Sequence, residues 1–380
     1  MKKKKVLRIS TVPISLNAFL RGQLQMLNEH YEIVGVSSPG PALDEVSRRE
    51  GVRVVELPME RQISIFKDLV SLFLMIRLFQ KEKPDMVHSL TPKAGMLSML
   101  AGWITGVPVR MHTFTGLVFP TATGLKQKIL IWTDRLTCAC ATHINPEGNG
   151  VKQDLIRFGI TKKPLKILAN GSVKGIDLDY FQRSPEVMQA AEAYKKEDCF
   201  TFCFVGRMVR DKGMNELVSA FVRLNAQYPK TRLFLIGPFE RNLDPVLPET
   251  EKQILNHLAI EFLDEQNDVR PFFAASQALV FPSYREGFPN VVLEAGAMGL
   301  PTIATDINGC NEIIIPGKNG VLVPSKDEAA LYAAMEDFLL HPEKVASLAA
   351  DSRQLIAERY DRKLIWDALL EEYNVLLKDK

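Results

Sequence analysis

Two charged segments in the second half of the chain have residue types and spacings that suit the binding of a diphosphate and of sugar hydroxyls. The first contains Gly206-Arg207 and Lys212-Gly213, and it lies between the apolar run Phe200–Val205 and a helical pattern. A glycine at the end of a strand lets the backbone turn, and the free N–H groups of the following helix attract an anion. Two cations at one place match a diphosphate better than a single carboxylate. A solvated loop with incidental charges remains an equal alternative for this segment alone.

The second segment places two carboxylates eight positions apart. Glu286 lies in a loop after the apolar run Ala278–Phe281. Glu294 lies about one turn into a helix that begins near Asn290. Two acceptors spaced in this way can each bind a pair of hydroxyls on separate sugar rings, and the helix N-terminus at Asn290 and Val291 is left to bind phosphate oxygens. The alternative is an ordinary charged loop with a partly buried glutamate.

The elements that must position these residues alternate between short apolar runs and helix-length segments. An alternation of strand and helix predicts βαβ units and a mostly parallel sheet. After Val323 the strands stop, and three helical stretches follow at Lys326–Leu340, Pro342–Tyr360 and Arg362–Lys378. The predicted strands are Val6–Ser10, Ile33–Val36, Val52–Leu57, Met86–His88, Val109–Thr113, Thr142–Asn145, Leu165–Leu168, Phe200–Val205, Arg232–Ile236, Ile260–Leu263, Ala278–Phe281, Pro301–Ala304 and Val321–Val323.

The length of the chain predicts two domains, because a single hydrophobic core stops growing at about 250–300 residues and this chain has 380. A polar, glycine-containing stretch at residues 170–184 interrupts the alternation and is the natural linker. We therefore predict an α/β protein with two Rossmann-like, doubly wound domains at residues 1–175 and 176–361, which face each other across a cleft. The C-terminal helix, residues 362–380, is predicted to pack back on the first domain.

The composition excludes several classes of protein. Hydrophobic residues make up 46% of the chain, which excludes a disordered protein, and only five residues are cysteines, which excludes a disulfide-rich one. The odd number of cysteines, with Cys138 and Cys140 as a lone C-x-C pair, indicates a reduced, cytosolic protein without structural zinc. Arg8 breaks the apolar run after the basic start, so no signal peptide is predicted. The longest uncharged stretch, residues 94–109, is too short to span a bilayer, so no transmembrane helix is predicted.

Charge is distributed unevenly along the chain. Residues 1–180 contain 25 Lys and Arg against 15 Asp and Glu, a net charge of +10, whereas residues 181–380 contain 22 against 30, a net charge of −8. A basic half indicates an anionic partner, such as a membrane surface, a phosphorylated acceptor or nucleic acid. Chance surface charge is the alternative.

One segment of the basic half is apolar on nearly all sides. Ile63–Phe79 is flanked by the basic residues Arg61, Lys81 and Lys83. Such a segment predicts a helix that is either buried in the core or laid on a bilayer interface. A buried helix is the commoner case, and the positive charge of this half favours the bilayer.

The two charged segments together resemble the motifs of the retaining glycosyltransferases of family 4, which have the GT-B fold and carry an E-x7-E motif. G-R-x4-K-G at residues 206–213 is followed by P-S-x-x-E-G-F-P-N-V-x-L-E-A at residues 282–295. The resemblance covers nearly the whole chain. Additional matches are Asn170-Gly171, Gly175–Asp177, Gly299–Ile303, Gly309–Glu312 and Asn319–Pro324.

The resemblance implies roles in binding the donor. Arg207 and Lys212 would bind the diphosphate and stabilise the departing nucleotide, where negative charge grows as the sugar–phosphate bond breaks. Glu286 would hold hydroxyls of the donor sugar, and Glu294 would hold those of the ribose. Arg207, Lys212 and Glu286 are the implied catalytic residues. The implied donor-binding residues, which include a base pocket at 269–270 and backbone groups at 288–291, are Gly206, Arg207, Lys212, Val269, Arg270, Glu286, Phe288, Pro289, Asn290, Val291 and Glu294.

The implied co-substrate is a nucleotide sugar, expected to be a UDP-sugar, and no separate cofactor is implied. With two cations and a helix N-terminus on the diphosphate, no divalent metal is needed. The residues identify no general base, which fits a front-face reaction in which the leaving phosphate takes the acceptor proton.

The first half resembles a narrower group of transferases, which extend bacterial surface polysaccharides on a polyprenyl-diphosphate carrier. The matching segments are Thr11–Pro13, His88–Gly95 and His112–Leu117. Lys93 opens a helix and is well placed to attract an acceptor phosphate, and an exposed lysine at a helix start is the alternative. The implied acceptor-binding residues are Asn17, Lys93, Thr115 and Gly116.

This half departs from the pattern of the group at two places. It lacks the Gly-Gly pair that many members carry in the first βα loop, and Thr115 stands where many have a histidine. His112 is expected to be structural rather than catalytic, because in an alternating strand its side chain points elsewhere.

We therefore predict a retaining, metal-independent hexosyltransferase that is cytoplasmic and peripheral on the inner face of the cell membrane. Its partners would be a nucleotide sugar, a polyprenyl-diphosphate-linked saccharide acceptor and an anionic membrane surface, with no nucleic acid. Its product would belong to a surface polysaccharide such as capsule or O-antigen. The alternatives are a nucleotide-sugar 2-epimerase of the same fold and a non-catalytic nucleotide-sugar-binding subunit.

Overall fold

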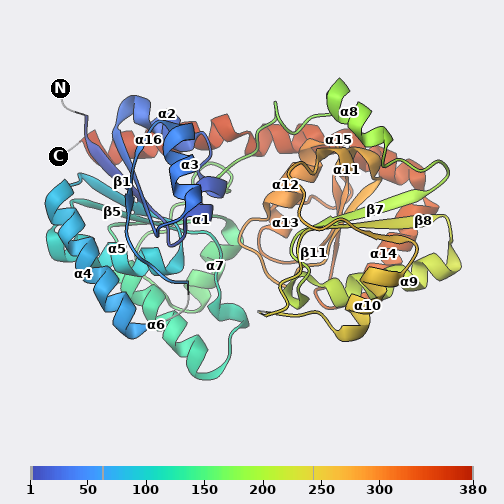
Figure 1. Cartoon of the computed structure of the whole chain (residues 1–380), viewed down its shortest axis with the longest axis horizontal. Coiled ribbons are helices and arrows are strands. Elements are labelled where there is room, and N and C mark those ends of the chain that lie inside the picture. The colour runs from blue at the N-terminus through green and yellow to red at the C-terminus, as the bar shows by residue number, and fades with distance from the viewer. Residues whose placement is uncertain (1–2, 62–63, 243, 379–380) are drawn as a thin grey trace. The chain divides into compact units, whose positions relative to one another are not determined.

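The computed structural model describes residues 3–61, 64–242 and 244–378, and the chain divides into two compact units (Figure 1). The first unit comprises Met1–Gly175 and Lys363–Lys380, and the second comprises Ile176–Arg362. Each unit contains one parallel sheet of six strands with helices packed on it. This is the layered architecture of a Rossmann-like domain, so the α/β class predicted from the alternating pattern is confirmed.

The sheet of the first unit is doubly wound. Its strands are β1 (Lys5–Ile9), β2 (Glu32–Ser37), β3 (Arg53–Glu56), β4 (Met86–Ser89), β5 (Val109–Phe114) and β6 (His143–Pro146). They lie in the order β3-β2-β1-β4-β5-β6, and every pair is parallel. The chain therefore starts in the middle of the sheet and winds outward in both directions, which makes the carboxyl ends of β1 and β4 the topological switch point.

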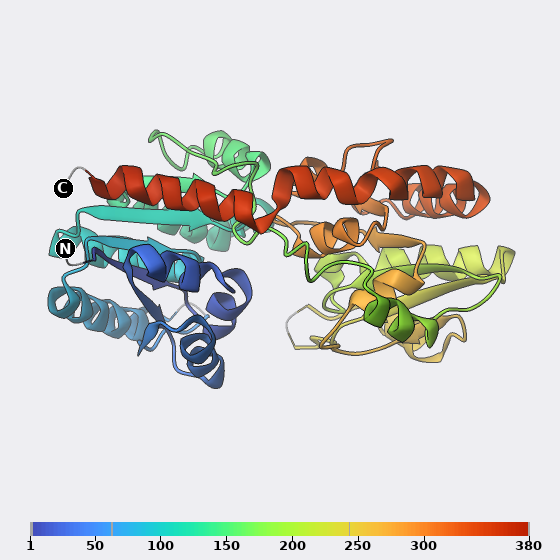
Figure 2. The same cartoon turned by 90° about the horizontal axis from the view of Figure 1, so that it is seen from above.

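Helices cover both faces of this sheet. They are α1 (Pro13–Phe19), α2 (Gln23–His30), α3 (Pro41–Glu50), α4 (Ile65–Glu82), α5 (Pro92–Thr105), η1 (Phe119–Thr121), α6 (Gly124–Cys140), α7 (Asn149–Arg157) and α16 (Arg362–Lys378). Buried residues of α4, α5 and α6 join one apolar cluster, and those of α2, α3 and α16 join another. The clusters lie on opposite faces because successive strand residues, such as Val6 and Leu7, point to opposite sides. Figure 2 shows α16 lying along the first unit.

The second unit repeats this topology. Its strands are β7 (Phe200–Val205), β8 (Thr231–Ile236), β9 (Ile260–Phe262), β10 (Ala278–Phe281), β11 (Thr302–Thr305) and β12 (Gly320–Val323). Their order is β12-β11-β10-β7-β8-β9, again with parallel pairs, so β7 and β10 flank the switch point. Its helices are α8 (Pro185–Glu192), η2 (Arg210–Lys212), α9 (Met214–Gln227), α10 (Pro248–Asn256), α11 (Arg270–Ala275), α12 (Asn290–Ala297), α13 (Cys310–Ile313), α14 (Glu328–Leu340) and α15 (Pro342–Tyr360).

One predicted strand, Leu165–Leu168, is wrong. Leu165 makes only an isolated bridge with Ile144, next to the edge strand β6. The carbonyl of Lys166 accepts a hydrogen bond from the side chain of Asn145 at 3.0 Å. The next backbone donor of a parallel ladder would be residue 146, which is a proline without an N–H, so the Asn145 side chain takes its place and the pairing stops there.

A buried polar network ties α16 to the first sheet. Arg8 Nη1 donates a hydrogen bond to the hydroxyl of Tyr373 at 3.0 Å, and His88 Nδ1 lies 2.6 Å from the same hydroxyl. His88 Nε2 lies 2.7 Å from Thr113 Oγ1. Burial, with the Arg8 charge as a smaller cause, lowers the pKa of His88 well below its usual value, so this ring is neutral.

Tyr373→Phe is expected to lower the free energy of unfolding of the first unit by about 1–3 kcal/mol, because buried Arg8 and His88 each lose a hydrogen-bond partner. Urea denaturation followed by tryptophan fluorescence measures this loss, since Trp103, Trp132 and Trp366 all lie in the first unit.

Tyr31→Phe is the matched control, because the hydroxyl of Tyr31 donates a hydrogen bond to Asn374, which also lies on α16. This hydrogen bond is less buried than those of the Tyr373 hydroxyl. Its loss is expected to be smaller. Equal losses for the two variants would show that the hydroxyl of Tyr373 has no special part in holding α16.

Candidate functional site

The candidate site lies at the carboxyl edge of the second sheet, where β7 and β10 are neighbours. Gly206 and Arg207 follow β7, Lys212 ends η2, and Glu286 lies in the loop after β10. Neighbouring parallel strands end at the same edge, so the topology brings the two charged segments together.

Lys212 and Glu286 form an ion pair whose side chains are only 18% and 15% exposed. Ser283 Oγ donates a hydrogen bond to the same carboxylate at 2.7 Å, and Lys212 Nζ lies 5.3 Å from the centre of the Phe281 ring. Charges in such a partly desolvated place interact more strongly than they do in water. The predicted phosphate-binding cation and the predicted sugar-binding carboxylate are therefore direct neighbours.

A glycine allows the two loops to meet. Gly213 has a φ of +71°, and a Cβ atom there would lie 2.1 Å from the carbonyl oxygen of Pro282. Tyr284 N donates to the carbonyl of Asp211 at 2.8 Å, and Arg285 pairs with the Asp211 carboxylate at 2.8 Å. Any side chain at position 213 would push the loops apart and so separate the Lys212–Glu286 pair.

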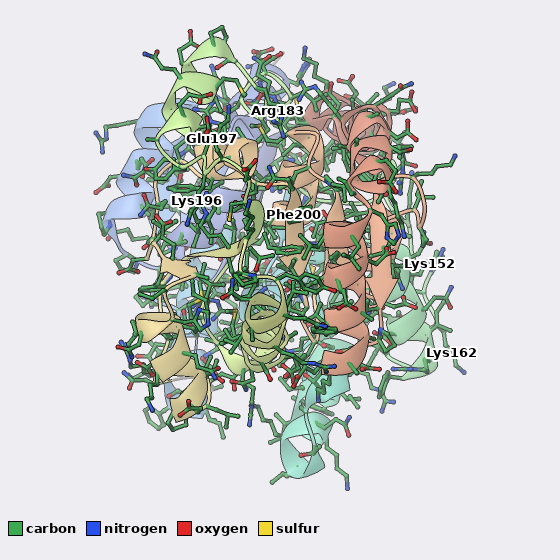
Figure 3. The ribbon with its side chains drawn as sticks, turned by 90° about the vertical axis from the view of Figure 1, so that its right-hand side faces the viewer. Lys152, Lys162, Arg183, Lys196, Glu197 and Phe200 are labelled. Atoms are coloured by element: carbon green, nitrogen blue, oxygen red, sulfur yellow. The ribbon has the colours of Figure 1, made fainter. Side chains whose placement is uncertain are left out.

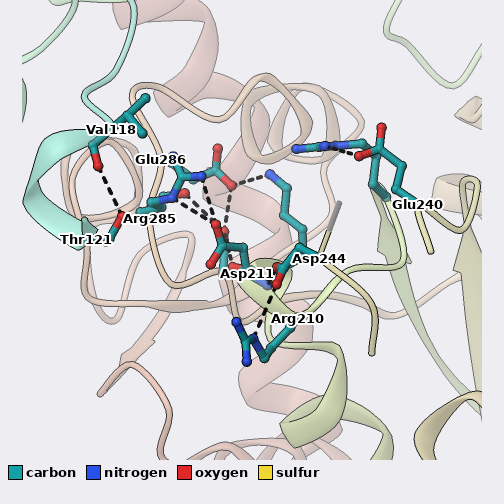
Figure 4. Close-up of polar contacts among 11 residues, drawn as sticks. Val118, Thr121, Arg210, Asp211, Glu240, Asp244, Arg285 and Glu286 are labelled. Atoms are coloured by element: carbon teal, nitrogen blue, oxygen red, sulfur yellow. Dashed lines mark hydrogen bonds and ion pairs between the residues drawn. The ribbon is translucent and has the colours of Figure 1, made fainter. Parts of the chain in front are cut away.

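Arg207 is more exposed than Lys212 and pairs with Glu240 at 2.5 Å (Figure 4). Glu240 lies after β8, which neighbours β7 on its other side. Glu240 lies in none of the sequence motifs and was not predicted from them. The strand order was the signal that could have found it, since the loops after β7 and β8 leave the sheet at the same edge.

Helix α12 carries the remaining predicted donor residues. Phe288 is buried against Tyr360, with ring centres 5.3 Å apart, and Pro289 precedes the first turn. Asn290 and Val291 form the start of the helix, and Glu294 lies one turn later, partly buried. No hydrogen bond from a side chain caps this N-terminus in the described part of the chain, which leaves its N–H groups suited to an anion.

Two arginines fix the other end of α12. Arg183 Nε donates to the carbonyl of Met298 at 2.8 Å, and Arg353 donates to the carbonyl of Ala297. Figure 3 labels Arg183, which precedes α8, and Phe200, the first residue of β7. Because its last carbonyls are bound, α12 presents Glu294 from a fixed position.

Cys310 lies close to the ion pair and was not singled out from the sequence. Burial raises the pKa of its thiol well above the usual value, and the nearby Glu286 carboxylate raises it further. A thiol that stays protonated is a packing group and not a nucleophile. Gly309 before it allows close approach, because a Cβ atom there would lie 2.5 Å from the carbonyl of Gly287.

The predicted base-pocket residues follow a different strand of the same sheet. Val269 and Arg270 start α11 after β9, which is the edge strand and is separated from β7 by β8. Arg270 pairs with Asp268 at 2.7 Å and lies over the ring of Tyr180, 3.7 Å from its centre. The Arg270 side chain is thus engaged by Asp268 of the preceding loop and by Tyr180, which lies far away in the sequence.

The structure places three of the predicted acceptor residues after neighbouring strands of the first unit. Lys93 starts α5 after β4, and its Nζ pairs with Asp68 at 2.6 Å. Its side chain is only 9% exposed, so the alternative of an exposed lysine is wrong. Thr115 follows β5 and donates to the carbonyl of Leu90 at 3.2 Å, and Gly116 after it has a φ of +119°.

Asn17 and His112 are engaged elsewhere. Asn17 lies on α1, where its amide nitrogen donates to Glu45 of α3 at 3.1 Å and its oxygen accepts from Arg49. Its side chain is therefore bound to α3. His112 is buried against Gly95, with Nδ1 2.8 Å from Ser89 Oγ, and burial lowers its pKa to about 3. These contacts agree with the structural role expected for His112.

The D-x-D sequence Asp177-Leu178-Asp179, a pattern typical of metal-dependent transferases, is partly engaged within its own unit. Asp177 pairs with Arg362, and its Oδ1 accepts from the backbone N–H of Tyr180 at 3.1 Å. Among the described residues, no group of three or more His, Cys, Asp or Glu is arranged to hold a metal ion.

The two doubly wound units have the same strand order, and cations and carboxylates lie at the carboxyl edge of the second sheet. Together these features define a glycosyltransferase of the GT-B fold. The family model described as "Glycosyl transferases group 1" matches residues 199–341, and the "Glycosyl transferase 4-like domain" matches residues 19–171. The chain is 31% identical over its whole length to the "Capsular polysaccharide biosynthesis glycosyltransferase CapM" of Staphylococcus aureus, and the match covers 99% of that protein. The chain therefore belongs to the family 4-like glycosyltransferases.

Two further similarities extend this result. Over 86% of the chain and 85% of the relative, it is 29% identical to the "UDP-Gal:alpha-D-GlcNAc-diphosphoundecaprenol alpha-1,3-galactosyltransferase" of Escherichia coli. The solved structure of Anabaena Alr3699/HepE in complex with UDP and glucose superposes with a TM-score of 0.80, at 16% identity, over 98% of this chain and 99% of that one. This structural likeness shows the shared fold.

Proposed function

We propose that the protein transfers a sugar from a UDP-sugar to a hydroxyl of a saccharide acceptor, with retention at the anomeric carbon, as a hexosyltransferase. The observation that carries the proposal is the Lys212–Glu286 ion pair. It joins a phosphate-binding cation and a hydroxyl-binding carboxylate in one site. A donor bound there has its leaving phosphate beside the cation and its sugar beside the carboxylate.

The cations of the site would stabilise the leaving group. As the bond between the anomeric carbon and the phosphate oxygen breaks, negative charge grows on the nucleotide, and Arg207, Lys212 and the first N–H groups of α12 can bind it. The acceptor oxygen forms the new bond on the same face of the sugar, and its proton passes to the leaving phosphate. These groups supply the positive charge that a metal would otherwise provide, so we propose a reaction without a divalent metal or a separate cofactor.

For the acceptor we propose a saccharide on a polyprenyl diphosphate. The Escherichia coli relative is named for transfer to GlcNAc-diphosphoundecaprenol, and the Staphylococcus aureus relative for capsular polysaccharide biosynthesis. Lys93 would contact the diphosphate, and the loop of Thr115 and Gly116 would contact the saccharide, because both follow neighbouring strands of the first sheet. The product would then belong to a bacterial surface polysaccharide.

A lipid-linked acceptor would require a peripheral enzyme on the inner face of the cell membrane. Among the described helices, none is both long enough and apolar enough to cross a membrane. The net charge of +10 on residues 1–180 supports attraction to an anionic membrane surface.

Release of UDP, measured with and without the lipid-linked acceptor and with and without EDTA, tests these proposals. We expect release to depend on the acceptor, to continue in EDTA, and to give a product with the anomeric configuration of the donor. Strong inhibition by EDTA that Mg²⁺ or Mn²⁺ reverses would contradict the metal-independent reaction. Interconversion of UDP-sugars without acceptor would identify an epimerase, and donor binding without any turnover would identify a non-catalytic subunit.

A further inference from the structure

Helices α4, α5 and α6 of the first unit carry exposed apolar side chains. Phe66 of α4 is 83% exposed, and Trp132 of α6 is 62% exposed. Large apolar side chains gathered on one surface mark a site of interaction. The residues that define this surface, which we call the outer apolar face, are Phe66, Leu69, Phe73, Trp103, Leu125 and Trp132.

Helix α4 has apolar side chains on two sides, and only one of these sides is buried in the core. Met75 and Phe79 are buried in the cluster on the sheet, whereas Phe66, Leu69 and Phe73 are exposed. The exposed side chains recur every three or four residues and therefore form a stripe along the helix. Helix α4 therefore has one buried apolar face and one exposed apolar face, so burial in the core accounts for only part of the predicted apolar segment. Ile63, the first residue of the predicted segment, lies outside the described residues.

The stripe on α4 continues across its neighbours. α4 packs against α5, and α5 packs against α6, so the three helices lie side by side over one face of the sheet (Figure 1). Met96 and Leu100 of α5 are partly buried, and they lead at helical spacing to exposed Trp103. Exposed apolar side chains of the outer apolar face therefore lie on all three neighbouring helices.

The exposed charges on these helices are basic. Arg77 and Lys81 are exposed on α4, and Lys126 and Lys128 are exposed on α6. The guanidinium of Arg77 lies over the ring of Phe73, 4.5 Å from its centre, so positive charge directly adjoins the apolar stripe.

The acidic residues of the three helices are paired or buried. Asp68 pairs with Lys93, Glu82 pairs with Arg53 at 2.6 Å, and Asp134 is buried. The exposed lysines and arginines beside the apolar side chains are therefore not neutralised by acidic residues of these helices and can attract anions.

The lysines beside the aromatic side chains favour a bilayer over a protein partner. Lysine is depleted at protein–protein interfaces, whereas aromatic side chains with Lys and Arg at their margins are typical of surfaces that lie in the headgroup region of a membrane. Basic residues near an anionic leaflet each add attraction that salt weakens.

We propose that the outer apolar face docks on an anionic lipid bilayer, with its aromatic side chains in the headgroup region and its basic border on the lipid phosphates. The proposal rests on the proposed function in one respect, because a lipid-linked acceptor requires the enzyme to work at the membrane surface. Asp68 on α4 holds Lys93 at the start of α5. Docking through α4 therefore places the candidate diphosphate-binding lysine close to the lipid surface.

Sedimentation with vesicles of phosphatidylglycerol and phosphatidylcholine tests this surface. We expect the wild-type protein to bind at low salt, and binding to weaken as salt rises and when Arg77, Lys81 and Lys83 are changed to Glu. Phe66→Asp/Trp132→Asp is expected to lower the partition coefficient about tenfold or more, because it removes two aromatic anchors. Thermal unfolding shows whether this variant still folds.

The matched control is Leu364→Asp/Val375→Asp, which changes two exposed apolar residues of α16 on the other face of the same sheet. We expect this variant to bind vesicles as the wild type does. An equal loss of binding in the control would overturn the proposal.

Tryptophan fluorescence gives a second readout that needs no disruption of binding. Brominated lipids are expected to quench Trp103 and Trp132, and the variant Trp103→Phe/Trp132→Phe should leave Trp366 unquenched. Quenching that persists in this variant would overturn the proposed orientation.

Two further outcomes would also overturn the proposal: a protein that stays in the supernatant at low salt, and a dimer that Phe66→Asp/Trp132→Asp abolishes in the absence of vesicle binding. The vesicle assays contain neither donor nor acceptor. Failure of the wild-type enzyme to transfer sugar to the lipid-linked acceptor in detergent solution would therefore count against the proposed function and leave the result on docking intact.

Discussion

Replacement of Lys212 by alanine is expected to lower kcat/KM about 10²–10³-fold, an effect of about 3–4 kcal/mol on the transition state. The ammonium group lies within the partly buried ion pair with Glu286, where its charge is little screened by water. Removing it takes away a cation from the departing phosphate and leaves the carboxylate of Glu286 without its partner. Steady-state kinetics with saturating acceptor measures the change.

Arg207→Ala is expected to lower kcat/KM at the low end of the same range, about 10²-fold. Its side chain is 48% exposed and pairs with Glu240, so solvent screens its charge more than that of Lys212. The wild-type thermal unfolding transition should be kept in both variants, because neither side chain lies in the apolar core.

The matched control for both variants is Arg210→Ala. Arg210 lies in the short helix η2 together with Lys212, but it pairs with Asp244 at 3.3 Å and is largely exposed. We expect near wild-type activity. Activity that is unchanged in the Arg207 and Lys212 variants, or a loss in the control as large as theirs, would contradict the assignment of a diphosphate site.

Glu286→Gln is expected to lower kcat about 10–10²-fold, because a contact to the donor sugar responds to the charge and geometry that develop at the anomeric carbon. The amide keeps the size of the side chain but loses its negative charge and hence the ion pair with Lys212. Glu294→Gln is expected mainly to raise the KM for the donor, since a contact to the ribose is the same in the ground state and the transition state.

Separate determination of kcat and of the donor KM for the two variants measures these effects. If the two signatures were exchanged, the roles of the two carboxylates would be exchanged as well. The double variant Lys212→Ala/Glu286→Gln adds an internal check, because residues in direct contact should give losses that do not add. Additive losses would show that the ion pair does not act as a unit.

Much of the fold could be read from the order of the residues. Apolar runs of strand length alternate with helical patterns, and every predicted strand except Leu165–Leu168 is present. The three C-terminal helices are also confirmed, because long amphipathic segments carry a strong periodic signal. The exception shows the limit of such patterns, since the pairing ends where its partner strand has Pro146, which has no N–H to donate.

The candidate site depended on both kinds of information. The G-R-x4-K-G and E-x7-E segments identified Lys212 and Glu286 by type and spacing, but their contact spans 74 positions and follows from the placement of β10 beside β7. The same strand order places Glu240, which no motif contains, beside Arg207. Arg270 is bound to Asp268 and Tyr180.

The sequence by itself determined the elements, the class of fold and the residues with the chemistry for binding a nucleotide sugar. Only the tertiary structure decided which of those residues touch, and which face of α4 is buried and which is exposed. The physical reason is that strand and helix periodicity is local, whereas the order of strands in a sheet and the use of a helix face depend on packing between segments far apart in the chain. Phe66 and Phe79 are both apolar residues of one helix, and only the neighbours that the fold supplies make one exposed and the other buried.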